Sequence, residues 1–337
     1  MANQTLERPV VAVTTVPGIV VSLGAVAVAV VVHRLFAGVS PLLSALVLGI
    51  VLANSGLVPA RTWSRLAPGF AFSARRFLRA GIVLLGVQIV LGDILGLGVG
   101  MLVLVVAIVV LGITITLGLG ALLGVPVDQR ILIACGFSIC GAAAIAGTSE
   151  VIEADDDDVA AGVALVALFG TAMIVLVPLV GPMLGLSDLQ TGMWAGGSIH
   201  EVAQVVAVGG SIGGAALTVA VLIKLARVMM LAPVAAALGV WHRRQSPTTA
   251  ARPPIVPLFV AAFIAMALIR TTGVLPNGVV HTAATAQLWL LAAAMFAIGC
   301  GCRFGTLRSL GWRPVALGAL STATVAAISY AGIVALY

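Results

Sequence analysis

Apolar stretches of about 20 residues recur along the whole chain, and they constrain the fold more than any other feature. As a helix, each stretch is long enough to cross a hydrocarbon layer roughly 30 Å thick. Of the 337 residues, 61% are hydrophobic and 8% are charged, whereas a soluble domain carries roughly a quarter charged residues. The sequence therefore predicts an all-α polytopic membrane protein with one transmembrane domain over residues 1–337.

We count eleven candidate spans. They cover residues 17–36, 41–57, 79–95, 98–122, 128–150, 158–184, 189–210, 214–240, 255–272, 282–302 and 312–336. The longest polar break, WHRRQSPTTAARPP at 241–254, contains proline and serine and is predicted to be a cytoplasmic linker loop within this one domain.

The arginines indicate an orientation. With the N-terminus in the cytoplasm, thirteen of the 17 basic residues fall on the inside: Arg8, Arg61, Arg65, Arg75, Arg76, Arg79, Arg130, Arg243, Arg244, Arg252, Arg303, Arg308 and Arg313. Outside loops hold only Arg34 and Arg270. Such an excess is typical of cytoplasmic loops and places the C-terminus outside. Topology explains the net charge of +6, so we expect no nucleic acid partner.

An acidic run, EADDDDV at 153–159, falls on the outside in this scheme. Its spacing lacks the pattern of an EF-hand calcium loop. We expect a solvated loop whose aspartates favour the N-terminus of the following helix.

Two of the spans contain helix-breaking patterns. In the fifth, Gly136 and Gly141 flank Ser138, and in the seventh, Gly196 and Gly197 precede Ser198. Glycine weakens a helix, and serine is a favoured N-cap. We expect each segment to form a half-helix, a bend and a restart whose free amide groups point into the protein, as in the substrate sites of many secondary transporters.

His200 and Glu201 follow the second break. Ser198 and Glu201 match the capping-box pattern S-x-x-E, which gives Glu201 a purely structural alternative. His200 and Gln204 are four residues apart and share a helix face. An ionisable group at this depth marks an ion or substrate path by default, and histidine titrates near neutrality. His200 or Glu201 is thus a candidate proton carrier, and a satisfied interior histidine is the alternative.

The eighth span carries Lys224 and Arg227 on one face near its middle. Placing each charged side chain at that depth costs roughly 2.5–3.5 kcal/mol of insertion free energy. The Lys224 side chain would have to extend a long way for its ammonium group to reach the membrane surface. Pairing with Glu201 could satisfy one of them. Two fixed cations against one carboxylate, beside helix N-termini, favour an anionic ligand.

The sequence also allows functions other than anion transport, and the segment HEVAQ at 200–204 suggests one of them. This segment approximates the zinc-protease motif H-E-x-x-H, but Gln204 occupies the position of the second histidine, so an intramembrane metalloprotease is disfavoured. We expect no enzyme activity, no metal and no cofactor. A passive anion channel is retained as an alternative to a transporter.

Four cysteines in apolar segments are predicted to be buried structural thiols: Cys135, Cys140, Cys300 and Cys302.

Three segments resemble the YeiH-type family of bacterial membrane proteins, which are named as sulfate exporters. The segments are CGFSICGAAAIAG at 135–147, GGSIHEVAQVVAVG at 196–209 and KLARVMMLAP at 224–233. The resemblance covers nearly the whole chain. It implies inverted repeats, two unwound helices crossing near the midplane, and elevator-like movement of a core against a scaffold. It also implies that one bend holds Cys135, Ser138, Cys140 and Gly141, and the other Gly197, Ser198, His200, Glu201 and Gln204, with Lys224 and Arg227 beside them.

Together these observations predict a bacterial inner-membrane secondary transporter, by the resemblance an exporter, that moves a small inorganic or sulfur-containing anion such as sulfate or sulfite by alternating access. Coupling to protons or sodium, contact with lipids and a homodimer are further expectations. One feature fits badly, because the fifth and seventh spans would run in the same direction, whereas crossing mates from inverted repeats are antiparallel. The best inverted pair in the sequence is 79–93 with 292–306. Two explanations stay open: one broken segment does not cross fully, or its mate is another span, such as the tenth.

Overall fold

The computed structural model describes residues 8–35, 41–245, 258–301 and 311–337, and in these ranges all regular secondary structure is helical. The elements are α1 (Arg8–Leu35), α2 (Pro41–Asn54), α3 (Ala60–Phe72), η1 (Ser73–Phe77), α4 (Leu78–Leu85), η2 (Gly86–Gln88), α5 (Leu91–Leu95), α6 (Gly98–Leu122), α7 (Val127–Ser138), α8 (Ala142–Ile152), α9 (Asp156–Met183), α10 (Asp188–Ser198), α11 (Val202–Ile212), α12 (Gly214–Met229), α13 (Leu231–Gln245), α14 (Leu258–Thr271), α15 (Asn277–Gly301) and α17 (Trp312–Leu336). The predicted linker begins inside α13, and its remainder lies outside the described residues, as do Arg252, Arg303, Arg308 and Cys302.

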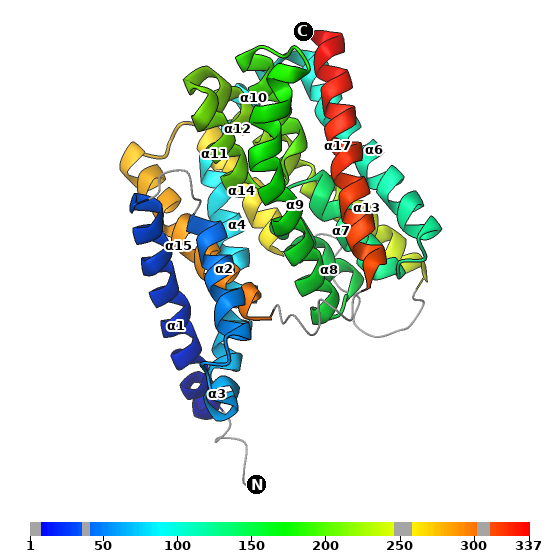
Figure 1. Ribbon diagram of the computed structural model, residues 1–337. Helices are drawn as coiled ribbons and strands as arrows, with labels where there is room; N and C mark the ends of the chain where they lie inside the picture. Colours follow the sequence, from blue (N-terminus) through cyan, green and yellow to red (C-terminus); the bar gives the residue numbers. More distant parts are fainter. Residues whose placement is uncertain (1–7, 36–40, 246–257, 302–310) are drawn as a thin grey trace.

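Within the described chain, six helices are long and apolar enough to cross a membrane. They are Thr15–Leu35, Gly98–Leu122, Asp156–Met183, Gly214–Arg244, Asn277–Gly301 and Trp312–Leu336. Shorter apolar helices accompany them at Ser44–Asn54, Ala142–Ile152 and Leu258–Thr271. The prediction of an all-α polytopic membrane protein is confirmed. The two termini lie at opposite ends of the molecule, as an odd number of crossings requires (Figure 1).

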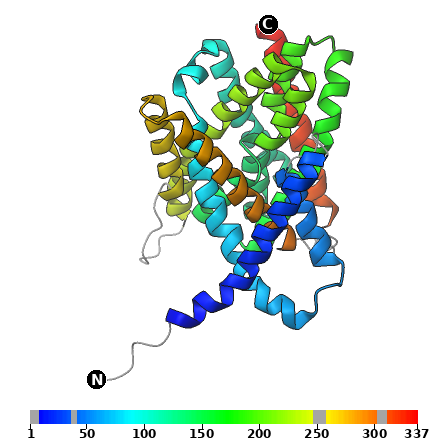
Figure 2. The same ribbon diagram turned by 90° about the vertical axis from the view of Figure 1, so that its left-hand side faces the viewer.

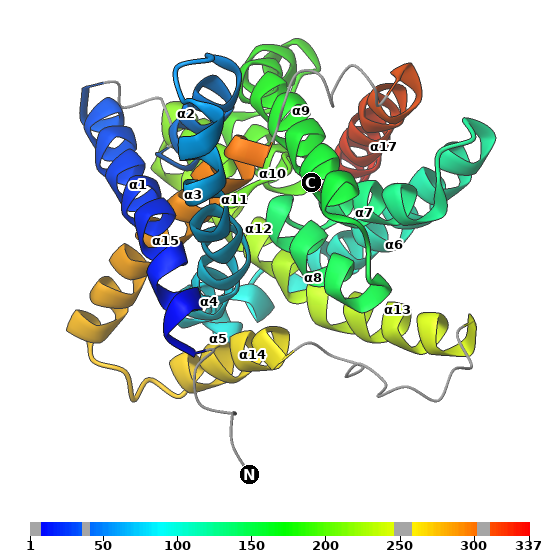
Figure 3. The same cartoon turned by 90° about the horizontal axis from the view of Figure 1, so that it is seen from below.

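The helices form two groups, which we call the panel and the core. The panel comprises residues 8–35, 41–88 and 258–301, and the core comprises residues 98–245 and 311–337. Seen from below, the two groups lie on opposite sides, with α10–α12 near the middle (Figure 3). In the panel, α1 and α15 cross each other (Figure 2).

Small residues allow close helix packing in the panel. Gly49 of α2 faces Gly299 of α15, and a Cβ built on Gly299 would lie 3.2 Å from the Cα of Gly49. Membrane helices commonly approach one another through such glycine contacts.

One broken segment, α10–α11, is a hairpin that returns to the end of the molecule from which it entered. The glycines of α10 show its direction, because Gly192 packs on Ala216 of α12 and Gly196 packs on Ala220. α10 is therefore parallel to α12. In contrast, α11 is joined to α12 by a tight turn at Gly213 and runs antiparallel to it. α10 and α11 must then be antiparallel to each other.

The other broken segment, α7–α8, is a second hairpin. Gly136 before the break packs against Ile145 after it. Along α9, Gly162 contacts Ile145, whereas Val166 contacts Gly141 at the break. α8 therefore runs back toward the start of α9, at the end of the molecule that holds the N-terminus. The two hairpins enter from opposite ends and meet at their tips (Figure 1).

This geometry corrects the predicted path of the fifth and seventh spans. The predicted breaks are present, but neither segment continues through to the opposite end of the molecule. The difficulty with their directions disappears, since the two hairpins point toward each other. Because the two reversals cancel, only the loops at 151–157 and 185–188 between the predicted spans change sides, and neither loop contains an arginine.

The acidic run is the part whose predicted position changes. It lies at the end that holds the basic residues of η1 and α4, and Arg75 forms an ion pair with Asp156. Arg79 pairs with Glu150 at 2.5 Å. The expectation that the aspartates favour a helix start is confirmed, because Asp156, Asp157 and Asp158 form the first turn of α9.

Candidate functional site

The two hairpin tips, residues 139–141 and 199–201, meet inside the core. Helical geometry ends at Ser138 in one hairpin and at Ser198 in the other. It resumes at Ala142, after Gly141 with φ of +78°, and at Val202, after an extended Glu201. Each tip thus presents the carbonyl end of one half-helix and the amide end of the next.

The serines do not cap the restarts, contrary to the prediction. Ser138 and Ser198 are the last residues of α7 and α10, and Ser198 Oγ donates to the carbonyl of Trp194 at 2.5 Å. Serine commonly bonds back to the preceding turn in this way. The actual N-caps are Gly141 and Glu201, and the Glu201 N–H donates to the side-chain oxygen of Gln204 (3.1 Å).

Arg227 of α12 is fully buried and joins the carbonyl ends of both hairpins. Its guanidinium donates to carbonyls of Phe137 (3.0 Å) and Ser138 (2.9 and 3.2 Å) in one tip, and of Gly196 (3.2 Å), Gly197 (2.7 Å) and Ile199 (3.1 Å) in the other. Helix C-termini leave such carbonyls without partners and carry partial negative charge. The guanidinium supplies both the missing donors and the compensating charge.

Lys224, one turn earlier on α12, bridges the same two tips. Its Nζ donates to the carbonyls of Ile139 and Ile199, at 2.9 Å each. Like Arg227, it has no exposed surface. Neither cation forms a salt bridge with Glu201 in the described chain, so the predicted pairing is absent. Both side chains hold the tips together, and neither is among the residues that line the cavities described below.

His200 is also fully buried, and both of its ring nitrogens have partners. Nδ1 lies 3.2 Å from the carbonyl of Phe137, and Nε2 lies 3.0 Å from the hydroxyl of Thr322 on α17. Nδ1 can only donate to the Phe137 carbonyl, and Nε2 shares the Thr322 hydroxyl with the carbonyl of Gly318, which lies 2.9 Å from that hydroxyl. The His200 ring packs on Phe137 at a centroid distance of 4.5 Å. This is the satisfied interior histidine that the sequence left as the alternative.

Gly197 and Gln204 also face inward. Gly197 lies against Ser329 of α17, where a Cβ would collide with the serine hydroxyl. Gln204 is 1% exposed and packs on Gly170 of α9. Neither residue lines a cavity in the described chain.

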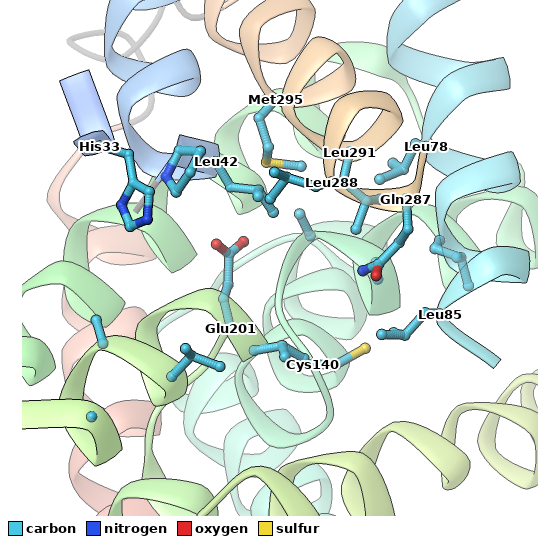
Figure 4. A pocket seen from close by; sticks show the side chains of 18 of the residues that line it. His33, Leu42, Leu78, Leu85, Cys140, Glu201, Gln287, Leu288, Leu291 and Met295 are labelled. Carbon is cyan, nitrogen blue, oxygen red and sulfur yellow. The ribbon is translucent and has the colours of Figure 1, made fainter. Parts of the chain in front are cut away.

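A cavity of about 700 Å³ lies between the core and the panel, on the amide side of the tips. From the core, Cys140, Ala142, Ala143, Glu201 and Val202 line it. The Glu201 carboxylate points into the cavity, with panel residues on the opposite wall (Figure 4). Lining residues His33 and Pro41 lie where α1 ends and α2 begins, so the cavity extends toward the end that holds the C-terminus.

A second cavity, of about 260 Å³, lies toward the opposite end. Trp63 of α3 and Asp156 of α9 line it, and so does Cys300 near the end of α15. Leu78 of the panel and Ala142 of the core line both cavities. The two cavities therefore adjoin at the first residue of α8 and at Leu78.

Of the predicted site residues, the structure brings Cys140 and Glu201 to the cavity, and it places Gly141 directly beneath Glu201. A Cβ on Gly141 would lie 2.6 Å from Glu201 Cγ. Sequence reasoning missed the panel wall, including His33, Leu78 and Gln287. These residues sit on otherwise ordinary apolar helices, and no local pattern distinguishes them. Cys135 and Cys140 are buried thiols, as predicted.

Comparison with known proteins agrees that this is a membrane protein. A UPF0324 membrane protein of Corynebacterium glutamicum is 49% identical over 94% of this chain and 91% of its own length. Another from Pseudomonas aeruginosa is 36% identical over 94% of this chain and 93% of its own length. One from Bacillus cereus is 32% identical over 80% of this chain and 77% of its own. No solved structure matches. The family model described as conserved hypothetical protein 698 matches residues 17–318, and the chain belongs to this YeiH-type family of membrane proteins.

Proposed function

We propose that this protein is a secondary transporter that moves a small anion across the membrane by alternating access. The observation that carries the proposal is the pair of cavities that approach the same hairpin tip from opposite ends. They share Leu78 and Ala142 and are not merged into one space. A substrate held at the tips would reach one end or the other when the core shifts against the panel. The family resemblance implies the same elevator-like movement.

The constriction at Leu78 and Ala142, where the two cavities adjoin, is our ground for preferring a transporter to a passive channel. A channel needs a continuous path, whereas here the inner cavity is the smaller, and two ion pairs join the panel to the core beside it. These are Arg75 with Asp156 and Arg79 with Glu150. Breaking and remaking such contacts is a natural part of a movement between two states.

Charge at the tips supports an anion as the cargo. Lys224 and Arg227 contribute two fixed positive charges and Glu201 one negative charge. The two carbonyl ends and two amide ends of the half-helices offset one another. The tips therefore carry net positive charge, and the amide ends of α8 and α11 face the cavity through Ala142, Ala143 and Val202. Backbone amides at a helix start favour anions.

Glu201 is our proposed proton carrier, in place of His200. Its carboxylate faces the cavity, while His200 is enclosed by Phe137 and Thr322. Protonation of Glu201 would make the site more positive and release its hold on the amide ends. Sodium coupling has less support, because the tip carbonyls that could bind a cation already accept from Lys224 and Arg227.

The arginine distribution supports a cytoplasmic N-terminus and an outside C-terminus in the bacterial inner membrane. In this orientation the larger cavity faces outward. Sulfate or sulfite is the first substrate to test, as the family resemblance implies. We identify no catalytic group among the described residues of the two tips, and we propose no enzyme activity.

The proposal is tested with purified protein in liposomes. We expect saturable anion uptake with counterflow, driven by an inward proton gradient. Glu201→Gln should leave counterflow intact and abolish the dependence on the gradient, because a carboxamide binds no proton in this range. Asp93→Asn, an exposed acid on α5, is the control and should behave as wild type.

Single-channel current without counterflow would instead assign the passive channel. Unchanged gradient dependence in Glu201→Gln would remove Glu201 as the proton carrier.

A further inference from the structure

The larger cavity is poorly matched to a bare inorganic ion. Its volume of about 700 Å³ lies within the range of roughly 300–1,000 Å³ that is typical for drug-sized organic ligands. A small oxyanion bound by protein is surrounded by several hydrogen-bond donors. Here most of the wall is aliphatic, with side chains such as Leu42, Ile82, Leu85, Val206, Leu291 and Met295.

Polar groups are concentrated at the hairpin tips. Glu201 and the first turns of α8 and α11 lie on the core wall, and Cys140 lies beside them. Across the cavity, the panel contributes His33 and Gln287. The Gln287 side chain already bonds to Gln88. The cavity thus combines one polar, ionisable wall with an aliphatic remainder.

We propose that the cavity binds an amphipathic organic anion, with a sulfonate or carboxylate head at the hairpin tips and an aliphatic body between panel and core. This inference rests on the proposed function and specifies its substrate class. Burying each methylene of the body contributes about 0.8 kcal/mol. The head would lie at the amide ends of α8 and α11, where the Glu201 carboxylate competes with it.

Binding of the anion is therefore linked to protonation of Glu201. The titratable or charged groups near this carboxylate are Cys140 in the other tip, Lys224 behind it on α12, and His33 across the cavity. Lys224 is committed to two carbonyls. An anionic head adds a second negative charge beside Glu201, so affinity should rise as the pH falls.

Short n-alkyl sulfonates in lipid nanodiscs test the inference by calorimetry, with empty nanodiscs subtracted. Methane-, propane- and pentanesulfonate are compared with sulfate and with pentylammonium. We expect the dissociation constant to fall about fourfold per added methylene, which is ~0.8 kcal/mol converted to a ratio. Pentanesulfonate should bind more tightly at acidic than at alkaline pH, and the Glu201→Gln variant should lose this difference.

Gly210→Leu supplies a variant that fills the aliphatic part. Gly210 lines the cavity on α11, and a Cβ there would meet nothing within 4 Å, so the helix tolerates the change. We expect at least tenfold weaker pentanesulfonate binding and unchanged methanesulfonate binding. Gly118→Leu on α6 is the matched control, since Gly118 is also helical, exposed and free of close neighbours.

Equal affinity along the alkyl series would overturn the inference, and so would tighter binding of pentylammonium than of pentanesulfonate. If the series fails while sulfate is carried with proton coupling, the proposed function stands and this inference falls. Absence of binding by every anion at every pH would overturn both.

Discussion

The two sides of the hairpin tips differ in how their unpaired backbone groups are satisfied. On the carbonyl side, Arg227 and Lys224 donate to both tips from a single helix and are completely enclosed. On the amide side, the half-helices begin at Gly141 and Glu201 beside a cavity of about 700 Å³. One side is a fixed structural junction, and the other side is open to a ligand.

This difference shows that positive side chains near a helix break need not bind substrate. Irregular backbone at membrane depth is stable only if its polar groups find partners. The carbonyl ends have permanent hydrogen-bond partners in Arg227 and Lys224. Because these partners are cations, they also leave net positive charge behind the amide ends. We therefore propose that Lys224 and Arg227 affect the electrostatic potential on the amide side without contacting a ligand bound there.

The largest expected effect is that of Arg227→Met. The change leaves the carbonyls of Ser138, Gly196 and Gly197 without their side-chain donor, whereas Phe137 keeps its contact with His200 and Ile199 keeps Lys224. At about 1 kcal/mol for each unsatisfied buried acceptor, the free energy of unfolding should fall by at least ~3 kcal/mol. Denaturant unfolding in detergent measures this loss. Arg34→Met, at an exposed arginine in the last turn of α1, is the control and should change little. Equal stability of the two variants would contradict the junction.

Lys224→Met should cost less, because it removes two donors and Arg227 still donates to Ile199. We expect a loss of about 1–3 kcal/mol in unfolding free energy. Lys224→Gln can restore one of the two hydrogen bonds but not the charge. It should regain part of the stability while anion affinity stays reduced, which separates the structural role from the electrostatic one. Full recovery of affinity in Lys224→Gln would show that the charge is irrelevant to binding.

On the open side, Gly141→Ala should have an intermediate effect. Its φ of +78° and ψ of −132° are disfavoured for any residue with a side chain, at a cost of about 1–3 kcal/mol. The new Cβ would also push on Glu201, 2.6 Å from its Cγ. Gly210→Ala, on the wall of the same cavity but without close neighbours, is the control. Thermal unfolding of the two variants measures the difference, and equal midpoints would show that the tip is not constrained.

Much of the architecture could be predicted from the sequence because its signals are local. Continuous apolar runs indicate the class, glycine and serine clusters indicate the breaks, and Lys224 and Arg227 stand out as cations inside a span. The direction of the chain after a break is not local. A glycine pair permits a straight continuation as well as a reversal, and packing against α9 and α12 decides between them.

The arginine pattern could not reveal the reversals either. Two hairpins from opposite ends leave the described arginines at the ends where they were predicted, and they move only the acidic run and one short loop. The prediction that Ser138 and Ser198 cap the restarted helices was wrong for a related reason. A serine at a break can end one helix or start the next. The residues that line the cavity from the panel could not be predicted, because they are brought there by contacts between segments far apart in the sequence. No local spacing of residue types indicates those contacts.

The smallest expected effect on stability is that of Glu201→Gln, and it tests the contrast between the two sides most directly. A carboxamide has nearly the same shape, keeps an oxygen beside the amide end of α8, and removes a half-buried charge from an aliphatic cavity. Because this side is open, we expect the free energy of unfolding to change by less than ~1 kcal/mol, although Glu201 is as close to a helix break as Lys224 is. Denaturant unfolding of Glu201→Gln and Lys224→Gln in parallel measures the contrast, since both substitutions remove one charge and introduce the same amide. A loss for Glu201→Gln as large as that for Lys224→Gln would mean that the carboxylate is part of the junction, and its proposed freedom to exchange a proton with the cavity would be lost.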